Sequence, residues 1–146
     1  MNIKMVVDND KYRPTYANTT DYCMDVKVRL DNEEEVINPS ESKVFGTGIK
    51  VAIPEGWGLF LLPRSSTGFK LSCRLANTIG MVDAGYRDEI KVKVNNFGNI
   101  PVSITDGQRL FQMFILPKYQ IEPTYVEDNE DFRSGDRGGG IGSTGV

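Results

Sequence analysis

Residues 90–99 decide the fold class of this chain, and they read Ile90-Lys91-Val92-Lys93-Val94-Asn95-Asn96-Phe97-Gly98-Asn99. The apolar residues Ile90, Val92 and Val94 alternate with two lysines, which is the period of a β-strand with one buried face. The asparagine- and glycine-rich end is typical of a turn. The stretch therefore predicts a strand that ends in a turn.

The same pattern extends along the chain on both sides of this stretch. Apolar residues alternate from Met24 to Leu30, and the apolar run from Trp57 to Pro63 is typical of a buried strand. Pro54-Glu55-Gly56 and Asp106-Gly107 are turn signals between such runs. The only helix candidate, Ser65 to Leu71, is short and weakly periodic. Short strands with frequent turns predict an all-β fold, a jelly-roll-like β-sandwich.

Composition limits the function classes that the chain can belong to. A formal net charge of −3 argues against a broad nucleic-acid-binding face, although it leaves room for a small cationic pocket. No apolar run approaches the roughly 20 residues of a membrane span, and the amino terminus lacks the order of a secretory signal. We therefore expect a cytoplasmic protein that binds neither nucleic acid nor membrane.

Metal-ligating residues are scarce. The chain has no histidine, and Cys23 and Cys73 do not have metal-ligand spacing. Zinc chemistry is therefore not expected, and two thiols in a reducing compartment are more often buried small apolar residues than a disulfide.

The composition changes near the carboxyl terminus. From Glu127 onward the chain is first acidic and then glycine-rich. Such a segment cannot bury enough apolar surface to order itself. The sequence therefore predicts a β domain over residues 1–126 and a flexible arm over residues 127–146.

A second stretch is the strongest candidate for a functional site, and it reads Gly80-Met81-Val82-Asp83-Ala84-Gly85-Tyr86-Arg87. Its two glycines flank an acid, and an aromatic residue closes it, which predicts a tight hairpin. A hairpin can offer backbone N–H and C=O groups to a planar ligand while its aromatic ring lies against a sugar. Taken alone, the segment could equally be an ordinary hairpin with a solvated Asp83.

Three further features fit phosphate chemistry, and each has a purely structural alternative. Pro63-Arg64-Ser65-Ser66-Thr67-Gly68 offers a guanidinium group and hydroxyls for phosphate oxygens, or a capped turn. Gln112 is an uncharged amide within an otherwise apolar strand, so it needs a partner. Asp25 begins an alternating strand, where an isolated acid is usually solvated.

In their order along the chain, these clusters resemble the five motifs of the trimeric dUTPases. The motifs correspond here to Asp25, Pro63 to Ser66, Gly80 to Arg87, Gly107 to Gln112, and Arg137 to Gly145. The resemblance covers nearly the whole chain. It implies a homotrimer that uses Mg²⁺ to hydrolyse dUTP to dUMP and pyrophosphate, which limits uracil incorporation into DNA and supplies dUMP for thymidylate synthesis.

The resemblance also implies a role for each matching residue. Tyr86 lies under the deoxyribose, and Asp83 contacts the 3′-hydroxyl group and orients the attacking water. Arg64 and Gln112 hold phosphates, and Asp25 reaches Mg²⁺ through water. The remaining residues implied to bind substrate are Ser65, Ser66, Asn77, Gly80, Met81, Val82 and Lys91.

The carboxyl-terminal arm is implied to close over a site formed by the other two subunits. Its residues implied to bind substrate are Arg137, Ile141, Gly142, Ser143 and Thr144. Ile141 stands where the family has a phenylalanine that stacks on uracil. Either the isoleucine covers the base, or an aromatic residue such as Phe97 or Phe132 replaces it.

Two other readings compete with this one. A dCTP deaminase shares the fold and the Arg-Ser-Ser loop, but it needs a glutamate where this chain has Lys93. A regulatory binding protein built on the dUTPase scaffold would use nucleotide occupancy as a switch. No extra domain or long insertion supports that second alternative, but the sequence leaves a protein partner open.

Overall fold

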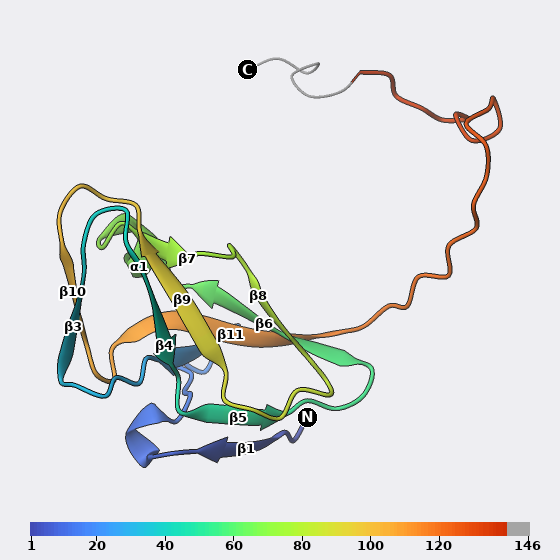
Figure 1. Cartoon of the computed structure of the whole chain (residues 1–146). Helices are drawn as coiled ribbons and strands as arrows, with labels where there is room; N and C mark the ends of the chain where they lie inside the picture. Colours follow the sequence, from blue (N-terminus) through green and yellow to red (C-terminus); the bar gives the residue numbers. More distant parts are fainter. Residues whose placement is uncertain (140–146) are drawn as a thin grey trace.

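The computed structural model describes residues 1–139, and nearly all of its regular elements are strands (Figure 1). One short α-helix, α1, spans Ser65–Phe69, and a single 3₁₀ turn spans Asp10–Tyr12. The strands are β1 (Lys4–Val7), β2 (Met24–Lys27), β3 (Glu34–Ile37), β4 (Ser42–Gly46), β5 (Ile49–Ala52), β6 (Trp57–Pro63), β7 (Cys73–Leu75), β8 (Gly80–Asp83), β9 (Lys91–Asn96), β10 (Val102–Thr105) and β11 (Arg109–Pro117).

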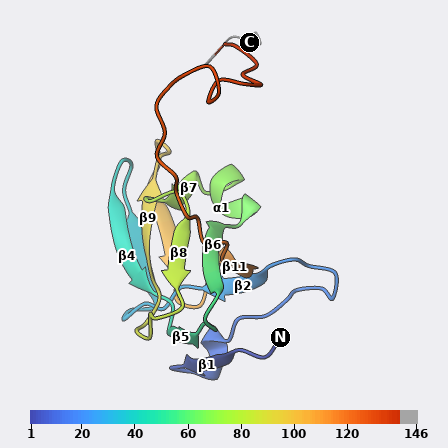
Figure 2. The ribbon, with the colours of Figure 1, turned by 90° about the vertical axis from the view of Figure 1, so that its right-hand side faces the viewer.

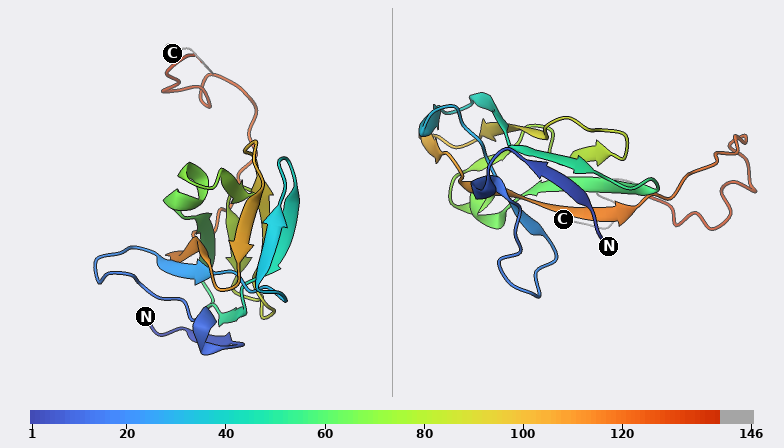
Figure 3. Two further views of the ribbon diagram at one scale, coloured as in Figure 1. Left: turned by 90° about the vertical axis from the view of Figure 1, so that its left-hand side faces the viewer. Right: turned by 90° about the horizontal axis from the view of Figure 1, so that it is seen from below.

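Two antiparallel sheets make up most of the molecule. One has four strands in the order β2-β11-β6-β8, and the other has three in the order β4-β9-β7. The pairs β1-β5 and β3-β10 complete the structure. Turned views show the two larger sheets as layers (Figures 2 and 3). The predicted all-β sandwich is confirmed.

The hydrophobic core joins these two sheets. Leu59, Leu61 and Phe111 from the four-stranded sheet and Val92 and Val94 from the three-stranded sheet belong to one buried cluster. Every second residue of β9 is buried, as the lysine alternation predicts. The predicted strand from Trp57 to Pro63 has the bounds of β6.

The predicted strand from Met24 to Leu30 is shorter than expected. It ends at Lys27, although Val28 and Leu30 are also buried. The backbone N–H of Val28 donates to Gln108 O, and that of Arg29 donates to Gly46 O. The chain changes its pairing partner there, so burial continues after the regular ladder stops.

Neither cysteine forms a disulfide. Cys73 lies in the core and Cys23 is half-buried. Burial raises the pKa of both thiols, so neither is prepared as a nucleophilic thiolate. No helix in the described part of the chain is long and apolar enough to cross a membrane.

The carboxyl-terminal segment leaves the domain after β11 (Figure 1). Residues 118–139 are exposed and contain no strand. Its one turn, at residues 128–135, is closed by an ion pair between Asp128 and Arg133. Pro117 is therefore the last residue of the sheet, nine residues before the predicted end of the β domain at residue 126.

Candidate active site

A buried carboxylate organises one end of the four-stranded sheet. Asp25 has a side chain that is only 9% exposed, and both of its oxygens are paired. Oδ1 accepts from Arg64 Nε at 2.8 Å, and Oδ2 accepts from Arg109 Nη1 at 3.0 Å. The sequence pattern favoured a solvated acid here, which is wrong, because two arginines compensate the burial of the charge.

Backbone and hydroxyl contacts hold Arg64 next to β11. Its N–H donates to Leu110 O at 2.9 Å, and its Nη1 donates to Arg109 O at 3.2 Å. The buried Thr67, in α1, donates its hydroxyl to the same Leu110 carbonyl at 2.5 Å. The start of α1, which carries Ser65 and Ser66, is therefore tied to β11 by hydrogen bonds on both sides.

Gln112 joins this group across the sheet. It pairs with Asp25 on one side and with Leu62 on the other. Its Nε2 donates to Pro63 O at 3.3 Å, which supplies the partner that a half-buried amide needs. The structure thus brings Asp25, Arg64 and Gln112 together, although they are far apart in the sequence.

The second candidate group surrounds the turn after β8. Asp83, Tyr86 and Lys91 line one hollow of about 250 Å³, together with Met81, Val82 and Ile90. The backbone N–H of Tyr86 donates to Asp83 O at 3.1 Å, and the Tyr86 hydroxyl donates to Glu89 O at 2.8 Å. These bonds fix the aromatic ring at the edge of the hollow.

Glu89 anchors this turn to the rest of the protein. Its carboxylate accepts two bonds of 3.0 Å from the Arg29 guanidinium group and one of 2.8 Å from Gly48 N–H. The Arg29 hydrogen bonds, with a smaller contribution from Gly48, hold the pKa of Glu89 below its usual value despite partial burial. The turn is therefore exposed at its tip and firmly attached at its base.

The predicted hairpin is wrong in one respect. β8 pairs with β6, whereas β9 pairs with β4 and β7, so the turn between β8 and β9 connects two sheets. Residues 84–90 separate the two strands, which is longer than the commonest hairpin connection. Alternation shows that each segment is a strand, but it does not specify which strand will pair with it.

Gly80 and Asn77 lie away from that hollow. Gly80 pairs with Leu61, and a Cβ atom at Gly80 would lie 3.2 Å from Leu61 Cβ, so the close approach of β8 and β6 favours glycine. Asn77 is exposed in the turn before β8, six residues before Asp83. The hollow within one chain therefore does not include Asn77.

The residues around Arg64 and the residues around Asp83 lie at opposite ends of β6. Asp83 pairs with Gly58 near the start of that strand, and Arg64 directly follows its end at Pro63. Six residues of extended strand span about 20 Å at roughly 3.3 Å per residue. Within one chain, Asp83 and Arg64 are too far apart to act on the same phosphate.

The arm residues lie partly within the described chain. Arg137 is exposed in the extended segment, whereas Ile141, Gly142, Ser143 and Thr144 lie outside the described residues. Of the two aromatic alternatives, Phe97 follows the end of β9 that is opposite Lys91. The centroid of its ring lies 5.6 Å from the Arg74 guanidinium carbon. Phe132 is 66% exposed in the arm.

Three residues beside Arg64 were not predicted from the sequence. Lys70, Gln108 and Arg109 line a hollow of about 310 Å³ together with Arg64, Ser66 and Leu71. The signal for Arg109 was its position in Gly107-Gln108-Arg109, next to the Gln112 strand. The pairing of β11 with β2 shifts register between Arg109 and Phe111. Alternation alone therefore could not predict on which face of the sheet the Arg109 side chain lies.

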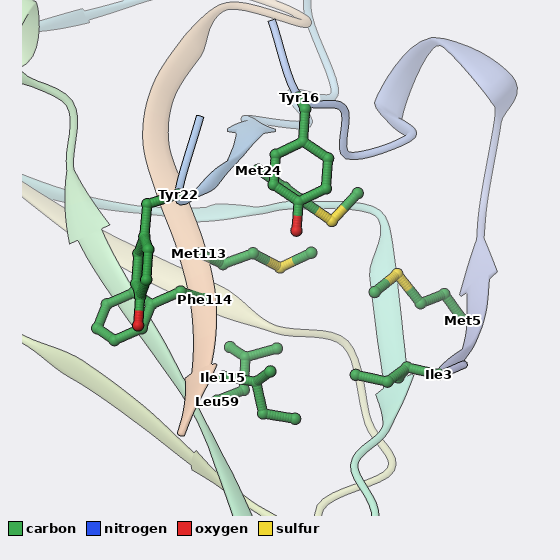
Figure 4. A pocket seen from close by; sticks show the side chains of 9 residues that line it. All are labelled: Ile3, Met5, Tyr16, Tyr22, Met24, Leu59, Met113, Phe114 and Ile115. Atoms are coloured by element: carbon green, nitrogen blue, oxygen red, sulfur yellow. The ribbon is translucent and has the colours of Figure 1, made fainter. Parts of the chain in front are cut away.

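Another hollow, lined by apolar and tyrosine side chains, lies elsewhere and contains none of the predicted site residues. It has a volume of about 250 Å³ and opens between β1 and β11 (Figure 4). Its lining residues are Ile3, Met5, Tyr16, Tyr22, Met24, Leu59, Met113, Phe114 and Ile115. A cavity without charged groups does not suit a phosphorylated ligand.

The donor set for a metal ion is limited. No group of three acidic, cysteine or histidine residues that could hold a cation occurs among residues 1–139. Asp25, the acid beside Arg64, already has both oxygens on arginine. A carboxylate in this position suits contact with a hydrated cation better than direct ligation.

Comparison with known proteins relates this geometry to one family. Residues 11–145 match the family model described as dUTPase. The chain is 35% identical over 146 residues to the deoxyuridine 5′-triphosphate nucleotidohydrolase of Finegoldia magna, covering 99% of each protein. It is 38% identical over 134 residues to the protein of the same name from Desulfitobacterium hafniense DCB-2, covering 91% of this chain and 87% of that protein.

Solved structures show the same fold at lower identity. The structure of the G164S mutant of the Staphylococcus bacteriophage 80alpha dUTPase with dUpNHpp has a TM-score of 0.84 and 24% identity, covering 99% of both chains. The dUTPase from Streptococcus mutans has a TM-score of 0.73 and 21% identity, covering 84% of this chain and all of that one.

Proposed function

Because the chain belongs to the dUTPase family, we propose that it is a dUTP diphosphatase that hydrolyses dUTP to dUMP and pyrophosphate. The observation that carries this proposal is the hollow lined by Asp83, Tyr86 and Lys91, in a chain that matches deoxyuridine 5′-triphosphate nucleotidohydrolases along its length. An acid, an aromatic ring and free backbone groups meet there on one surface.

The hollow beside β8 binds the nucleoside in this proposal. The Tyr86 ring, held through its hydroxyl group by Glu89 O, lies under the deoxyribose and leaves no room for a ribose 2′-hydroxyl group. Backbone groups of Gly80, Met81 and Val82, with those near Lys91, read the uracil edge. A methyl group at position 5 of the base would clash with backbone that lies so close to the uracil edge, and the site therefore excludes thymine.

Asp83 orients the attacking water. Its side chain is exposed at the end of β8, where it can accept a proton from a water molecule placed in line with the scissile bond. General-base assistance of this kind contributes about 10²–10⁴-fold, and positioning and electrostatic stabilisation supply the rest.

The phosphates bind at the other end of the sheet. Arg64 is held by Asp25 and by β11, so its position does not depend on the ligand. Ser65, Ser66 and Gln112 add hydrogen-bond donors next to it. A pre-positioned guanidinium group stabilises charge on phosphate oxygens without the cost of reorganisation.

Mg²⁺ accompanies the triphosphate in this proposal, and Asp25 contacts it through water. Both Asp25 oxygens are paired with arginines, which favours contact through water over direct ligation, and the D95N mutant dUTPase from phage phi11 of S. aureus coordinates a structural Mg(II) ion. The ion supplies charge neutralisation at the phosphates when it is bound.

One nucleotide needs more than one copy of this chain, because about 20 Å separates the two groups along β6. A second copy that places its Arg64 end beside the Asp83 of the first would complete a site. We propose the homotrimer of the family as that assembly. A closed ring of three copies gives each Asp83 a neighbouring Arg64.

The outer face of the four-stranded sheet is the surface that we assign to this assembly. Between Gln112 and Asp83, this face carries the side chains of Leu62, Phe60 and Phe114. The Phe60 and Phe114 rings stack with their centroids 5.5 Å apart. Met81, opposite Phe60, is 64% exposed. An apolar strip between two polar groups is typical of an interface core with a polar rim.

The carboxyl-terminal arm closes the site. Residues 127–139 are exposed and extend away from the domain, which supports a role on a neighbouring copy (Figure 1). Arg137 and the residues at 141–144 then meet the phosphates and the base. Deleting the chain after Asp131 should preserve the assembly and impair turnover, whereas full activity of that protein would contradict this assignment.

A substrate panel tests the activity. The purified protein with Mg²⁺ should convert dUTP to dUMP and pyrophosphate far faster than it converts dTTP, dCTP or UTP. Comparable turnover of dTTP would overturn the proposal, and release of ammonia from dCTP would favour the deaminase alternative.

A mixing experiment tests the shared site. Asp83→Asn and Arg64→Gln proteins should each be inactive alone. When they are mixed, dissociated and reassembled at equal ratio, about a quarter of sites combine an intact Asp83 with an intact Arg64 from another copy. Activity should return to about that fraction, and absence of any recovery would place both residues in one chain's site.

A further inference from the structure

An ion pair beneath the turn after β8 joins the nucleoside hollow to the rest of the fold. Arg29 donates two hydrogen bonds of 3.0 Å to the Glu89 carboxylate, and Gly48 N–H donates a third of 2.8 Å. The Arg29 and Glu89 side chains are 31% and 16% exposed, so solvent screens their attraction only in part. The pair is therefore a stronger attachment than an ion pair on the open surface.

Glu89 lies between groups that line the hollow. Its backbone carbonyl accepts the Tyr86 hydroxyl at 2.8 Å, and the two residues that follow it, Ile90 and Lys91, line the hollow together with Tyr86. Ile90 is held independently, because its carbonyl accepts the hydroxyl of the buried Thr47 at 2.7 Å. The position of Glu89 therefore sets how far Tyr86 stands from Ile90 and Lys91.

Arg29 is itself fixed by contacts outside the hollow. Its backbone N–H donates to Gly46 O at 2.9 Å, and its Nε lies 3.4 Å from an Asp8 carboxylate oxygen. Gly46 in turn pairs with Lys91 in the ladder between β4 and β9. The guanidinium group therefore reaches Glu89 from the far side of Gly46, and it has its own support there.

Gly46 leaves the space that the pair occupies. A Cβ atom at Gly46 would overlap Glu89 Oε1 and lie 3.0 Å from Arg29 Nη2. The backbone of Gly46 lies within β4 and outside the left-handed region, so alanine can adopt its conformation. Gly46→Ala should therefore separate the two charged groups without removing either charge.

We propose that the Arg29–Glu89 pair is a positioning element that holds the nucleoside hollow at the width that deoxyuridine needs. The inference rests on the proposed function and deepens it, since the pair acts on the nucleoside through Tyr86 and Lys91. Asp83 is held separately, by the pairing of β8 with β6, and the phosphate-binding residues lie at the other end of β6. Loss of the pair should weaken nucleoside binding and spare both turnover at saturation and phosphate binding.

Steady-state kinetics with dUTP and Mg²⁺ tests the proposal on full-length Glu89→Gln, Arg29→Gln and Gly46→Ala. Each variant should raise KM about 10-fold and keep kcat within about threefold, because a misplaced binding surface weakens ground-state and transition-state binding alike. Calorimetry should show a similar loss of affinity for dUMP, whereas the affinity for inorganic pyrophosphate should change by less than about twofold.

Glu35→Gln is the matched control. It breaks an ion pair of 2.9 Å with Lys43, whose side chain is 31% exposed, as that of Arg29 is, and neither Glu35 nor Lys43 lines the hollow. This variant should leave KM unchanged. Arg29→Lys keeps the charge and should recover part of the affinity that Arg29→Gln loses. Together with Gly46→Ala, it keeps the proposal testable if either glutamine variant fails to fold.

Each result decides the proposal. An unchanged KM in Glu89→Gln, Arg29→Gln and Gly46→Ala would overturn it, and so would an equal rise of KM in Glu35→Gln. Equal losses of dUMP and pyrophosphate affinity would show a general structural role and would also overturn it. Absence of dUTP turnover in wild type would instead refute the proposed function, and dUMP binding would still test the pair.

Discussion

The two ends of β6 place polar groups in very different surroundings. At the Pro63 end, Asp25 is almost completely buried between two arginines, and Thr67 and Gln112 bond to the backbone. At the Gly58 end, Asp83 and Tyr86 are exposed around an open hollow. At the Pro63 end, these polar groups find partners within one chain. At the Gly58 end, Asp83 and Tyr86 are open to contact with a ligand or a neighbouring copy. Mutation of the buried Asp25 should therefore affect mainly stability, whereas mutation of the exposed Asp83 should affect mainly turnover.

The largest effect is expected at the open end. Asp83→Asn removes the proton acceptor and should lower kcat by about 10²–10⁴-fold. Because the side chain is exposed, thermal stability and binding of a non-hydrolysable dUTP analogue should stay close to wild type. Steady-state kinetics and calorimetry measure both quantities. Wild-type turnover in this variant would remove Asp83 from the mechanism.

The buried end should respond in the opposite way. Asp25→Ala leaves two arginines facing each other without their shared carboxylate and should cost about 3–5 kcal/mol of folding stability. Chemical denaturation measures this change. Asp31→Ala is the matched control, because the 97% exposed Asp31 makes only a 3.7 Å surface pair with Arg29 and should matter by less than about 1 kcal/mol. Equal effects of the two substitutions would contradict the comparison.

A smaller, pH-dependent effect is expected at the base of the turn. Arg29 lowers the pKa of Glu89 in the folded protein below its ordinary value of 4.5. A carboxylate of this kind stabilises the fold above about pH 4.5, and the contribution is lost as the pH falls through the lower, folded-state pKa. Unfolding followed between pH 6 and about pH 3 should therefore show a shallower loss of stability for Glu89→Gln than for wild type. Parallel curves would exclude Glu89 as a source of the acid sensitivity.

The smallest effect is expected from the Tyr86 hydroxyl group. Tyr86→Phe removes one exposed hydrogen bond to Glu89 O and should cost less than about 1 kcal/mol of stability. Since the ring remains, dUTP should still be strongly preferred over UTP. Tyr86→Ala is the comparison, and it should relax that preference by opening space for a 2′-hydroxyl group. A UTP preference that is unchanged in both variants would separate Tyr86 from sugar recognition.

Local patterns predicted the strands well and the pairing between them poorly. β6 and β9 were correctly predicted because alternation and apolar runs report how each strand is buried. The turn after β8 was expected to be a hairpin, yet its two strands belong to different sheets. Pairing depends on contacts between distant segments, which no local pattern contains.

The same division applies to the candidate site. Motif order in the sequence indicated Asp25, Arg64 and Gln112, and the fold brings these three together. Arg109 lies within the Gly107 to Gln112 motif, but a register shift decides where its side chain lies, and the end of a helix decides where Lys70 lies. Only the folded chain shows that a buried acid connects Arg109 to Arg64.

By itself, the sequence determined that the chain is all-β, that it resembles the dUTPases, and which residue types would meet a nucleotide. The reason is that side-chain period and motif order are local properties of the chain. The tertiary structure alone decided that Asp25 is buried between two arginines and that β6 separates Arg64 from Asp83 by nearly its whole length. Those facts depend on sheet register and on the desolvation of a charge, which arise only when distant strands pack together.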